Sequence, residues 1–149
     1  QVLTERGYQV IMTRESNDVN MSWAERARLA EKSGAGALIH IHAHSQESTS
    51  VTGVLASCQS SRNPYNGDLA SESYALSSCI AGSVSQAAGA KNRGVKQTEI
   101  NWSQVPVTSL ETGFLSNQQE ELLLSQEEYQ SQIAVGIADG LDQFFAGRR

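Results

Sequence analysis

The 149-residue sequence is poor in proline, cysteine and aromatic residues, and it has no long apolar or basic run. With two prolines it has no proline-rich linker, and its length suits a single domain. No apolar stretch approaches the roughly 20 residues of a membrane-spanning helix. The net charge of −5 and the lack of a dense Lys/Arg cluster argue against nucleic-acid binding. We therefore expect one globular domain, without nucleic-acid binding and without membrane insertion.

The scarce cysteines and tryptophans carry little functional signal. Cys58 and Cys79 could form one disulfide or remain two buried thiols, and a single pair does not identify the redox compartment. No base stands at a spacing that would make either thiol a nucleophile. Trp23 and Trp102 are interpreted as packing or surface residues rather than as a platform for a sugar.

Short β-branched runs alternate with helical patterns along the chain. Ser22 and Glu25 form a capping box that predicts a helix to about residue 32. The expected strands are 8–14, 37–43, 53–57 and 105–111, with a loop and short strand in 93–102; further helices are expected at 69–88 and from residues 117 and 125. This alternation predicts an α/β fold, a three-layer sandwich with a mostly parallel sheet flanked by helices.

All three histidines lie at alternate positions of the run ALIHIHAHS, as His40, His42 and His44. In a strand they would share one face. Glu111 ends another predicted strand, and functional groups of such sheets gather beyond the carboxyl ends of strands. An imidazole near a carboxylate is typical of metal-assisted hydrolysis. The alternative is hydrogen-bonded histidines without metal, and a capping or salt-bridging glutamate.

Several segments, in order, resemble the zinc-dependent N-acetylmuramoyl-L-alanine amidases of the amidase-3 family. RGYQVIMTRESND resembles the strand before an Arg-containing turn of that family. WAERARLAEKSGAGALIHIHAHS resembles its helix and the following strand, which carries Ser-Ile-His-Ala-Asn. NRGVK and VPVTSLETGFLSN match two further stretches, and the family has Glu-x-Gly-Phe-x-Ser-Asn in the last one. The resemblance extends over nearly the whole chain.

The resemblance implies roles for two residues, His42 as a zinc ligand and Glu111 as the catalytic glutamate. His40 and His44 stand where the family usually has Ser and Asn, so neither is implied to be a ligand. The implied reaction is hydrolysis, by zinc-activated water, of the amide between N-acetylmuramic acid and the L-alanine of the stem peptide. Peptidoglycan would be the partner, the location extracytoplasmic (secreted, cell wall or periplasm), and wall-targeting domains could accompany the domain in its parent chain.

The family places two further zinc ligands near its N-terminus, and no counterpart of either is found here. No histidine precedes His40, and Glu5 lies too close to the expected strand to match the second ligand. We therefore expect residues 1–149 to form a single amidase-3-like domain that lacks the first strand and most of the first helix of the family. Such a chain should bind zinc poorly and could be inactive alone.

Two alternatives remain open from the sequence. One is a non-catalytic amidase fold that acts in cell-wall binding or scaffolding. The other is a different zinc hydrolase, such as a carboxypeptidase, that uses His42 and His44 together.

Overall fold

The computed structural model describes residues 1–98 and 103–148, and its centre is a four-stranded sheet. The strand order is β1-β4-β2-β3. β1 pairs with β4 and β2 with β3 in parallel, whereas β2 and β4 are antiparallel. The expected mostly parallel sheet is therefore confirmed, with one antiparallel pairing at its middle. The strands are β1 Leu38–His44, β2 Val54–Gln59, β3 Asn92–Thr98 and β4 Val107–Phe114.

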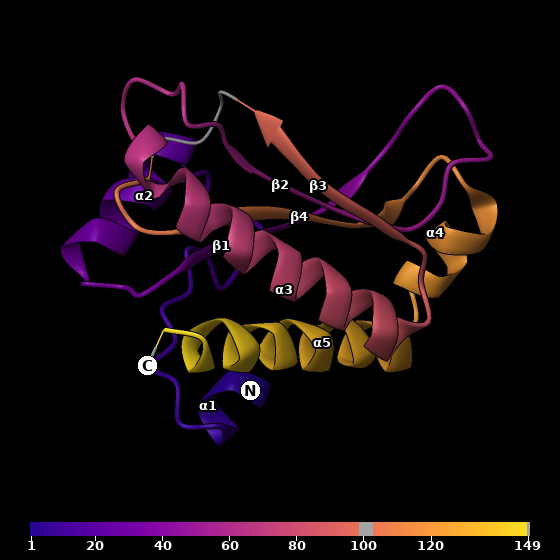
Figure 1. Ribbon diagram of the computed structural model, residues 1–149. Helices are drawn as coiled ribbons and strands as arrows, with labels where there is room; N and C mark the ends of the chain where they lie inside the picture. Colours follow the sequence, from indigo (N-terminus) through magenta and orange to yellow (C-terminus); the bar gives the residue numbers. More distant parts are fainter. Residues whose placement is uncertain (99–102, 149) are drawn as a thin grey trace.

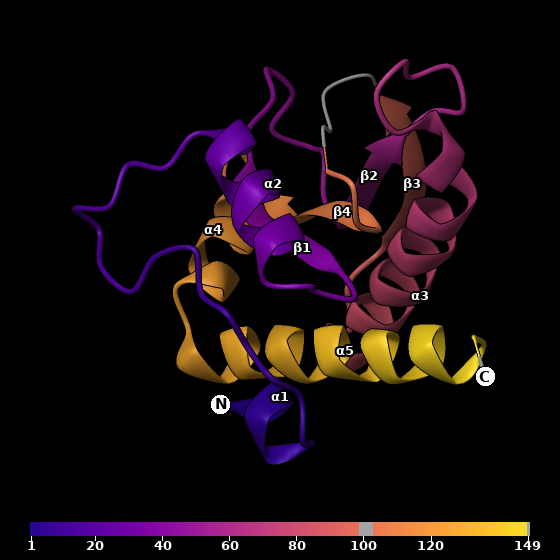
Figure 2. The same cartoon turned by 90° about the vertical axis from the view of Figure 1, so that its left-hand side faces the viewer.

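Helices cover both faces of this sheet. α2 lies on one face, and α3 and α5 lie next to each other on the other (Figures 1 and 2). This arrangement is the predicted three-layer sandwich. The helices are α1 Val2–Glu5, α2 Trp23–Lys32, the 3-10 turn Gly67–Leu69, α3 Ala70–Ala88, α4 Gln118–Leu124 and α5 Glu127–Ala146. None of the described helices is long and apolar enough to cross a membrane.

The main core lies between the sheet, α3 and α5. Leu110 of β4 and Val54 of β2 are fully buried against apolar residues of α3. At Gly140 of α5 an added Cβ would lie 2.6 Å from the Cα of Ile80, so only glycine permits this close approach of the two helices. The helical residues of this core include Leu76, Ile80 and Val84 of α3 and Tyr129, Ile133, Ile137, Leu141 and Phe144 of α5.

A smaller core joins α2 to the opposite face of the sheet. Ala30 of α2 is buried against Leu38 of β1 and Val107 of β4. The predicted capping box is present, because the Ser22 hydroxyl accepts a hydrogen bond from the Glu25 N–H while the Glu25 carboxylate accepts one from the Ser22 N–H. The capping box therefore determines where α2 begins, and α2 is the helix that covers this face of the sheet.

The strand predicted at 8–14 does not form. This segment is irregular, and no described strand pairs with it. Val10, Ile11 and Met12 are exposed by 39%, 45% and 62%, so its apolar residues contribute little to the core. The prediction was wrong because a β-branched run becomes a strand only where a neighbouring strand supplies hydrogen bonds and a surface to cover.

The other boundaries differ modestly from the predictions. β4 continues past Glu111 to Phe114, and α5 begins at Glu127 rather than at Ser125. The short strand expected within 93–102 is observed as β3. Residues 99–102 of that prediction lie outside the described residues. Both cysteines are free thiols, and burial raises the pKa of each. The structure therefore favours the thiol alternative over the disulfide.

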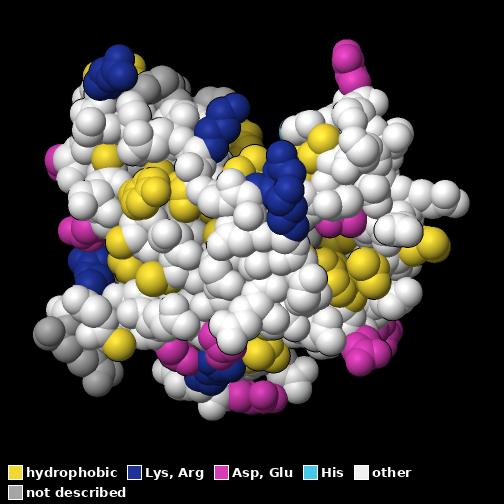
Figure 3. All heavy atoms as spheres, turned by 45° about the vertical axis from the view of Figure 1, so that its right-hand side comes forward, with side chains coloured by type: hydrophobic (Ala, Val, Ile, Leu, Met, Phe, Trp, Pro, Cys, Tyr) yellow, Lys and Arg dark blue, Asp and Glu magenta, His cyan; other side chains and the backbone are white. Residues whose placement is uncertain are grey.

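Ion pairs and a hydrogen bond hold α1 and the residues after it against α5. Arg6 lies 2.7 Å from Asp139 and 2.6 Å from Asp142, and the Tyr8 hydroxyl donates to Asp142 at 2.6 Å. Figure 3 shows a basic group among acidic ones at the lower edge of the molecule, where α1 meets α5. α1 lies against the side of α5 that faces away from the sheet (Figures 1 and 2).

Candidate active site

His42 and Glu111 are direct partners in the parallel ladder of β1 and β4. Because side chains alternate along strands, Leu38, His40 and His42 share one face with their partners Val107, Ser109 and Glu111. This is the face that α2 covers at its other end. The imidazole and the carboxylate therefore emerge side by side near the carboxyl end of β1, as the sequence predicted.

These two residues line a cavity of about 310 Å³. Glu111 lies on a central strand, because its neighbours in the ladder are His42 on one side and Leu55 on the other. The Thr112 hydroxyl donates to the backbone oxygen of His42 at 2.9 Å, which ties the two strand ends together. The remaining residues around the cavity are Trp23, Ala43, His44, Ser57, Thr98 and Ser109.

One buried atom on each residue of this pair has no hydrogen-bond partner. They are Nε2 of His42 and Oε2 of Glu111. Buried polar atoms in folded proteins are nearly always paired, and leaving one unpaired costs about 1–3 kcal/mol. Two such atoms at one cavity therefore indicate that a ligand, a water molecule or an ion completes them.

The donor chemistry suits zinc only in part. A neutral imidazole nitrogen and a carboxylate oxygen are both zinc ligands, but a catalytic zinc usually has three protein ligands. In the parts of the chain that the structure describes, no group of three or more His, Cys, Asp or Glu residues could hold a metal ion. His42 fits one position of a zinc site, and the full site is not formed by the described residues.

The three histidines of β1 occupy different environments. His40 is 6% exposed, and burial, with the nearby charges of His42 and Arg26, lowers its pKa to about 4. It is therefore neutral at pH 7. His44 is exposed and also lines the cavity, and its ring makes a T-shaped contact with that of Phe114 at 5.6 Å between centroids. Only His42 combines a place on the cavity with a buried, unpaired nitrogen.

Comparison with known proteins identifies the family. Residues 1–143 match the model of the Amidase_3 family, N-acetylmuramoyl-L-alanine amidase. The chain belongs to this family.

Individual relatives agree with this assignment. The uncharacterized protein YqiI of Bacillus subtilis (strain 168) is 30% identical over 147 residues, which are 96% of this chain and 67% of YqiI. The N-acetylmuramoyl-L-alanine amidase LytC of the same strain is 29% identical over 134 residues, 87% of this chain but 26% of LytC. The Amidase_3 chain thus spans about a quarter of LytC.

Solved structures show the same fold. The catalytic domain of CwlV, an N-acetylmuramoyl-L-alanine amidase from Bacillus (Paenibacillus) polymyxa var. colistinus, superposes with a TM-score of 0.83 at 29% identity. The match covers 97% of this chain and 77% of that chain. The α/β fold and the family resemblance predicted from the sequence are confirmed. The roles of His42 and Glu111, and the missing first strand, stay predictions.

The sequence did not indicate that Trp23 lies at this Amidase_3 site. It was predicted to be a packing or surface residue, and it lines the cavity beside His42 while 41% exposed. No pattern in the sequence marks it, because its position depends on how α2 sits over the sheet. The hydroxyls of Ser57, Thr98 and Ser109 were missed for the same reason. Trp102 lies outside the described residues.

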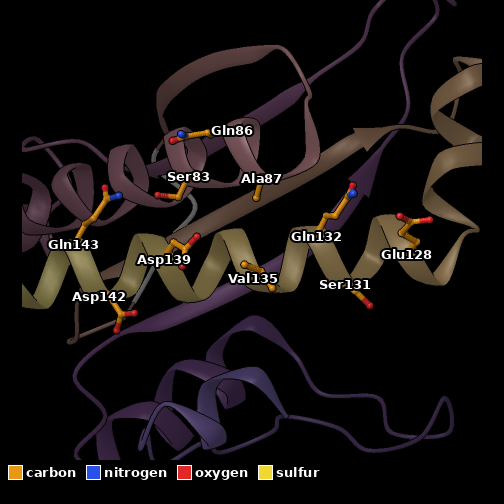
Figure 4. Close-up of a pocket in the computed structure, with 10 residues that line it drawn as sticks. All are labelled: Ser83, Gln86, Ala87, Glu128, Ser131, Gln132, Val135, Asp139, Asp142 and Gln143. Carbon is orange, nitrogen blue, oxygen red and sulfur yellow. The ribbon is translucent and has the colours of Figure 1, made fainter.

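A larger cavity, of about 760 Å³, lies between α3 and α5 and is not the candidate site (Figure 4). It has no histidine or cysteine among the residues that line it, and two of its carboxylates, Asp139 and Asp142, are paired with Arg6. Ser83 contributes one buried, unpaired hydroxyl. We place the candidate active site in the smaller cavity, because there an imidazole and a carboxylate of the described residues meet, each with an unpaired atom.

Proposed function

We propose that this Amidase_3 domain hydrolyses the amide bond between N-acetylmuramic acid and the L-alanine of the stem peptide in peptidoglycan. The observation that carries the proposal is the direct pairing of His42 and Glu111, each with one buried, unpaired atom at the same cavity. Membership of the Amidase_3 family supports the choice of bond and substrate, and gives no support to a carboxypeptidase.

Glu111 would carry the proton in this reaction. Its Oε2 is free to accept a proton from the attacking water and to deliver it to the leaving alanine nitrogen. A residue in this role must be held firmly, and the backbone of Glu111 is paired with β1 on one side and with β2 on the other. General acid–base catalysis of this kind contributes about 10²–10⁴ in rate.

His42 would hold a zinc ion through Nε2. Zinc, when bound, lowers the pKa of a coordinated water toward about 7 and polarises the scissile carbonyl. The Thr112 hydroxyl, hydrogen-bonded to the backbone oxygen of His42, would help to keep the imidazole in position. Because the described residues offer no group of three ligands, we expect residues 1–149 to bind zinc weakly.

The substrate would be recognised locally, within the cavity. The net charge of −5 does not favour binding to an anionic wall polymer. Hydroxyls of Ser57, Thr98 and Ser109 on the cavity wall are suited to hydrogen bonds with the amides and hydroxyls of the substrate. Action on peptidoglycan implies an extracytoplasmic location, and wall-targeting domains elsewhere in the parent protein would add affinity.

A second candidate is cell-wall binding or scaffolding without catalysis. The small number of zinc donors among the described residues favours it. Purified peptidoglycan distinguishes the two functions. An amidase creates new alanine amino groups, whereas a binding domain sediments with the peptidoglycan and creates none.

A further inference from the structure

Trp23 is an exposed aromatic residue that lines the candidate active site. It is the first residue of α2, directly after the N-cap Ser22. Its side chain lines the same cavity as His42 and Glu111 and remains 41% exposed. A large aromatic residue that is exposed at a polar cavity is available to a ligand, since burial of its exposed apolar surface would be favourable.

The indole is held in place before any ligand binds. Its ring centroid lies 4.4 Å from that of His40 and 5.3 Å from that of His42. The guanidinium of Arg26 lies 5.7 Å from the ring centroid and is itself fixed by a hydrogen bond of 3.1 Å to the Met21 backbone oxygen. A side chain with these contacts loses little conformational entropy when a ligand covers it.

We propose that Trp23 is a substrate-binding platform that stacks on the apolar face of the muramyl sugar ring. This inference rests on the proposed function, because it takes the scissile amide to lie at His42 and Glu111. The sugar is favoured over the peptide on chemical grounds. A pyranose ring presents a flat C–H face that matches an indole in size, whereas the adjacent stem residue, alanine, offers a single methyl group. The hydroxyl-bearing residues Ser57 and Thr98 of the cavity suit the polar edges of the sugar.

Fluorescence tests the platform without turnover. The chain has two tryptophans, so a Trp102→Phe variant leaves Trp23 as the only indole, and Glu111→Gln in the same chain prevents hydrolysis. N-acetylmuramoyl-L-alanine should shift or quench the emission of Trp23, whereas a free stem peptide that begins with L-alanine should not. An unchanged spectrum with the sugar ligand, or an equal change with the peptide alone, would overturn the proposal.

Steady-state kinetics of Trp23 variants provide a second test, besides fluorescence. Trp23→Ala should raise KM for soluble muramyl peptides about tenfold, which corresponds to about 1.4 kcal/mol, with a smaller change in kcat. Trp23→Phe should restore part of the loss. The matched control is Tyr74→Ala, since Tyr74 is 47% exposed on α3, which covers the other face of the sheet. Equal KM values for Trp23→Ala and Tyr74→Ala would also overturn the proposal.

The two arms separate this inference from the proposed function. If the wild-type chain releases no alanine amino groups while the sugar ligand still changes the emission of Trp23, the amidase activity is wrong and the platform stands. If alanine is released but the emission does not respond, the activity stands and the platform is wrong.

Discussion

His42 and Glu111 are paired residue to residue across β1 and β4, and each keeps one buried side-chain atom without a partner in the described structure. Each unpaired atom costs folding free energy, about 1–3 kcal/mol. Functional sites are where folded proteins carry such costs. The unpaired atoms therefore support our proposal that this Amidase_3 domain binds its substrate at this pair.

Zinc binding should depend on His42. After dialysis we expect the purified chain to retain less than one zinc ion per molecule, because the described residues supply too few ligands. With zinc added, His42→Ala should weaken the measured affinity at least about tenfold. His44→Asn is the control and should leave the affinity unchanged. If the chain instead holds zinc tightly and His44→Asn also abolishes binding, the site would be built from both His42 and His44.

Glu120 should be a main contributor to stability near the active site. Its buried carboxylate accepts the N–H of Gly53 at 2.6 Å and that of Phe114 at 2.7 Å, and so joins the start of β2 to the end of β4. Glu120→Ala leaves both N–H groups unpaired and should reduce the free energy of unfolding by about 3 kcal/mol.

Urea unfolding measures this loss. Glu121→Ala, at an exposed position of the same helix, should change the free energy of unfolding by less than about 0.5 kcal/mol. Glu120→Gln keeps one acceptor oxygen and should fall between the two. Equal stability of the Glu120→Ala and Glu121→Ala variants would show that the two hydrogen bonds contribute little.

Two glycine-to-alanine substitutions, at Gly140 and at Gly82, should change the stability of the protein in opposite directions. Gly140→Ala places a Cβ 2.6 Å from the Cα of Ile80 and 2.9 Å from the Cys79 oxygen, so α3 and α5 must separate. We expect Gly140→Ala to reduce the free energy of unfolding by about 2 kcal/mol. Gly82→Ala, within α3, meets nothing within 4 Å and should gain about 0.5–1 kcal/mol from helix propensity. Thermal unfolding of both variants checks the prediction, and a shift of the same sign in both would contradict this packing.

The contact between α1 and α5 should weaken in acid. Hydrogen bonds from the Tyr8 hydroxyl and then from Arg6 lower the pKa of Asp142 below its ordinary value of 3.8. The unfolded chain therefore binds a proton at a higher pH than the folded chain does. The stabilisation is complete above the unfolded pKa and is lost as the pH falls through the folded pKa.

Asp142→Asn should accordingly lower the urea midpoint at pH 7, and its difference from the wild type should shrink as the pH falls below about 4. Urea midpoints measured at pH 7, 5, 4 and 3 test this. A difference that stays constant over this range would mean that the charge of Asp142 does not stabilise the fold.

Local signals in the sequence were enough for most of the fold. The capping box of Ser22 and Glu25 and the apolar spacing of α3 depend on neighbouring residues, and both gave the observed helices. The alternation of the histidines correctly placed His40 and His42 on one face, whereas the ladder register shifts between His42 and His44. The strand predicted at 8–14 failed because a strand requires a partner, which no local pattern supplies.

The site itself was predictable only in part. His42 and Glu111 could be assigned to the ends of strands, but their pairing follows from the placement of β4 beside β1, which is a property of the whole sheet. The position of Trp23 at the cavity likewise depends on the packing of Ala30 in α2 against the sheet. Sequence patterns identify the chemical groups, and the tertiary fold decides which of them meet.

The most direct test of the central claim is the release of alanine amino groups from purified peptidoglycan, with zinc in excess, by the wild type and by Glu111→Gln. We expect new N-terminal alanine from the wild type and a yield at least about 100-fold lower from Glu111→Gln, while Glu121→Gln retains the wild-type yield. Equal thermal unfolding midpoints of the three chains would exclude misfolding as the cause. No alanine release by the wild type, or an equal yield from Glu111→Gln, would contradict amide hydrolysis catalysed by Glu111.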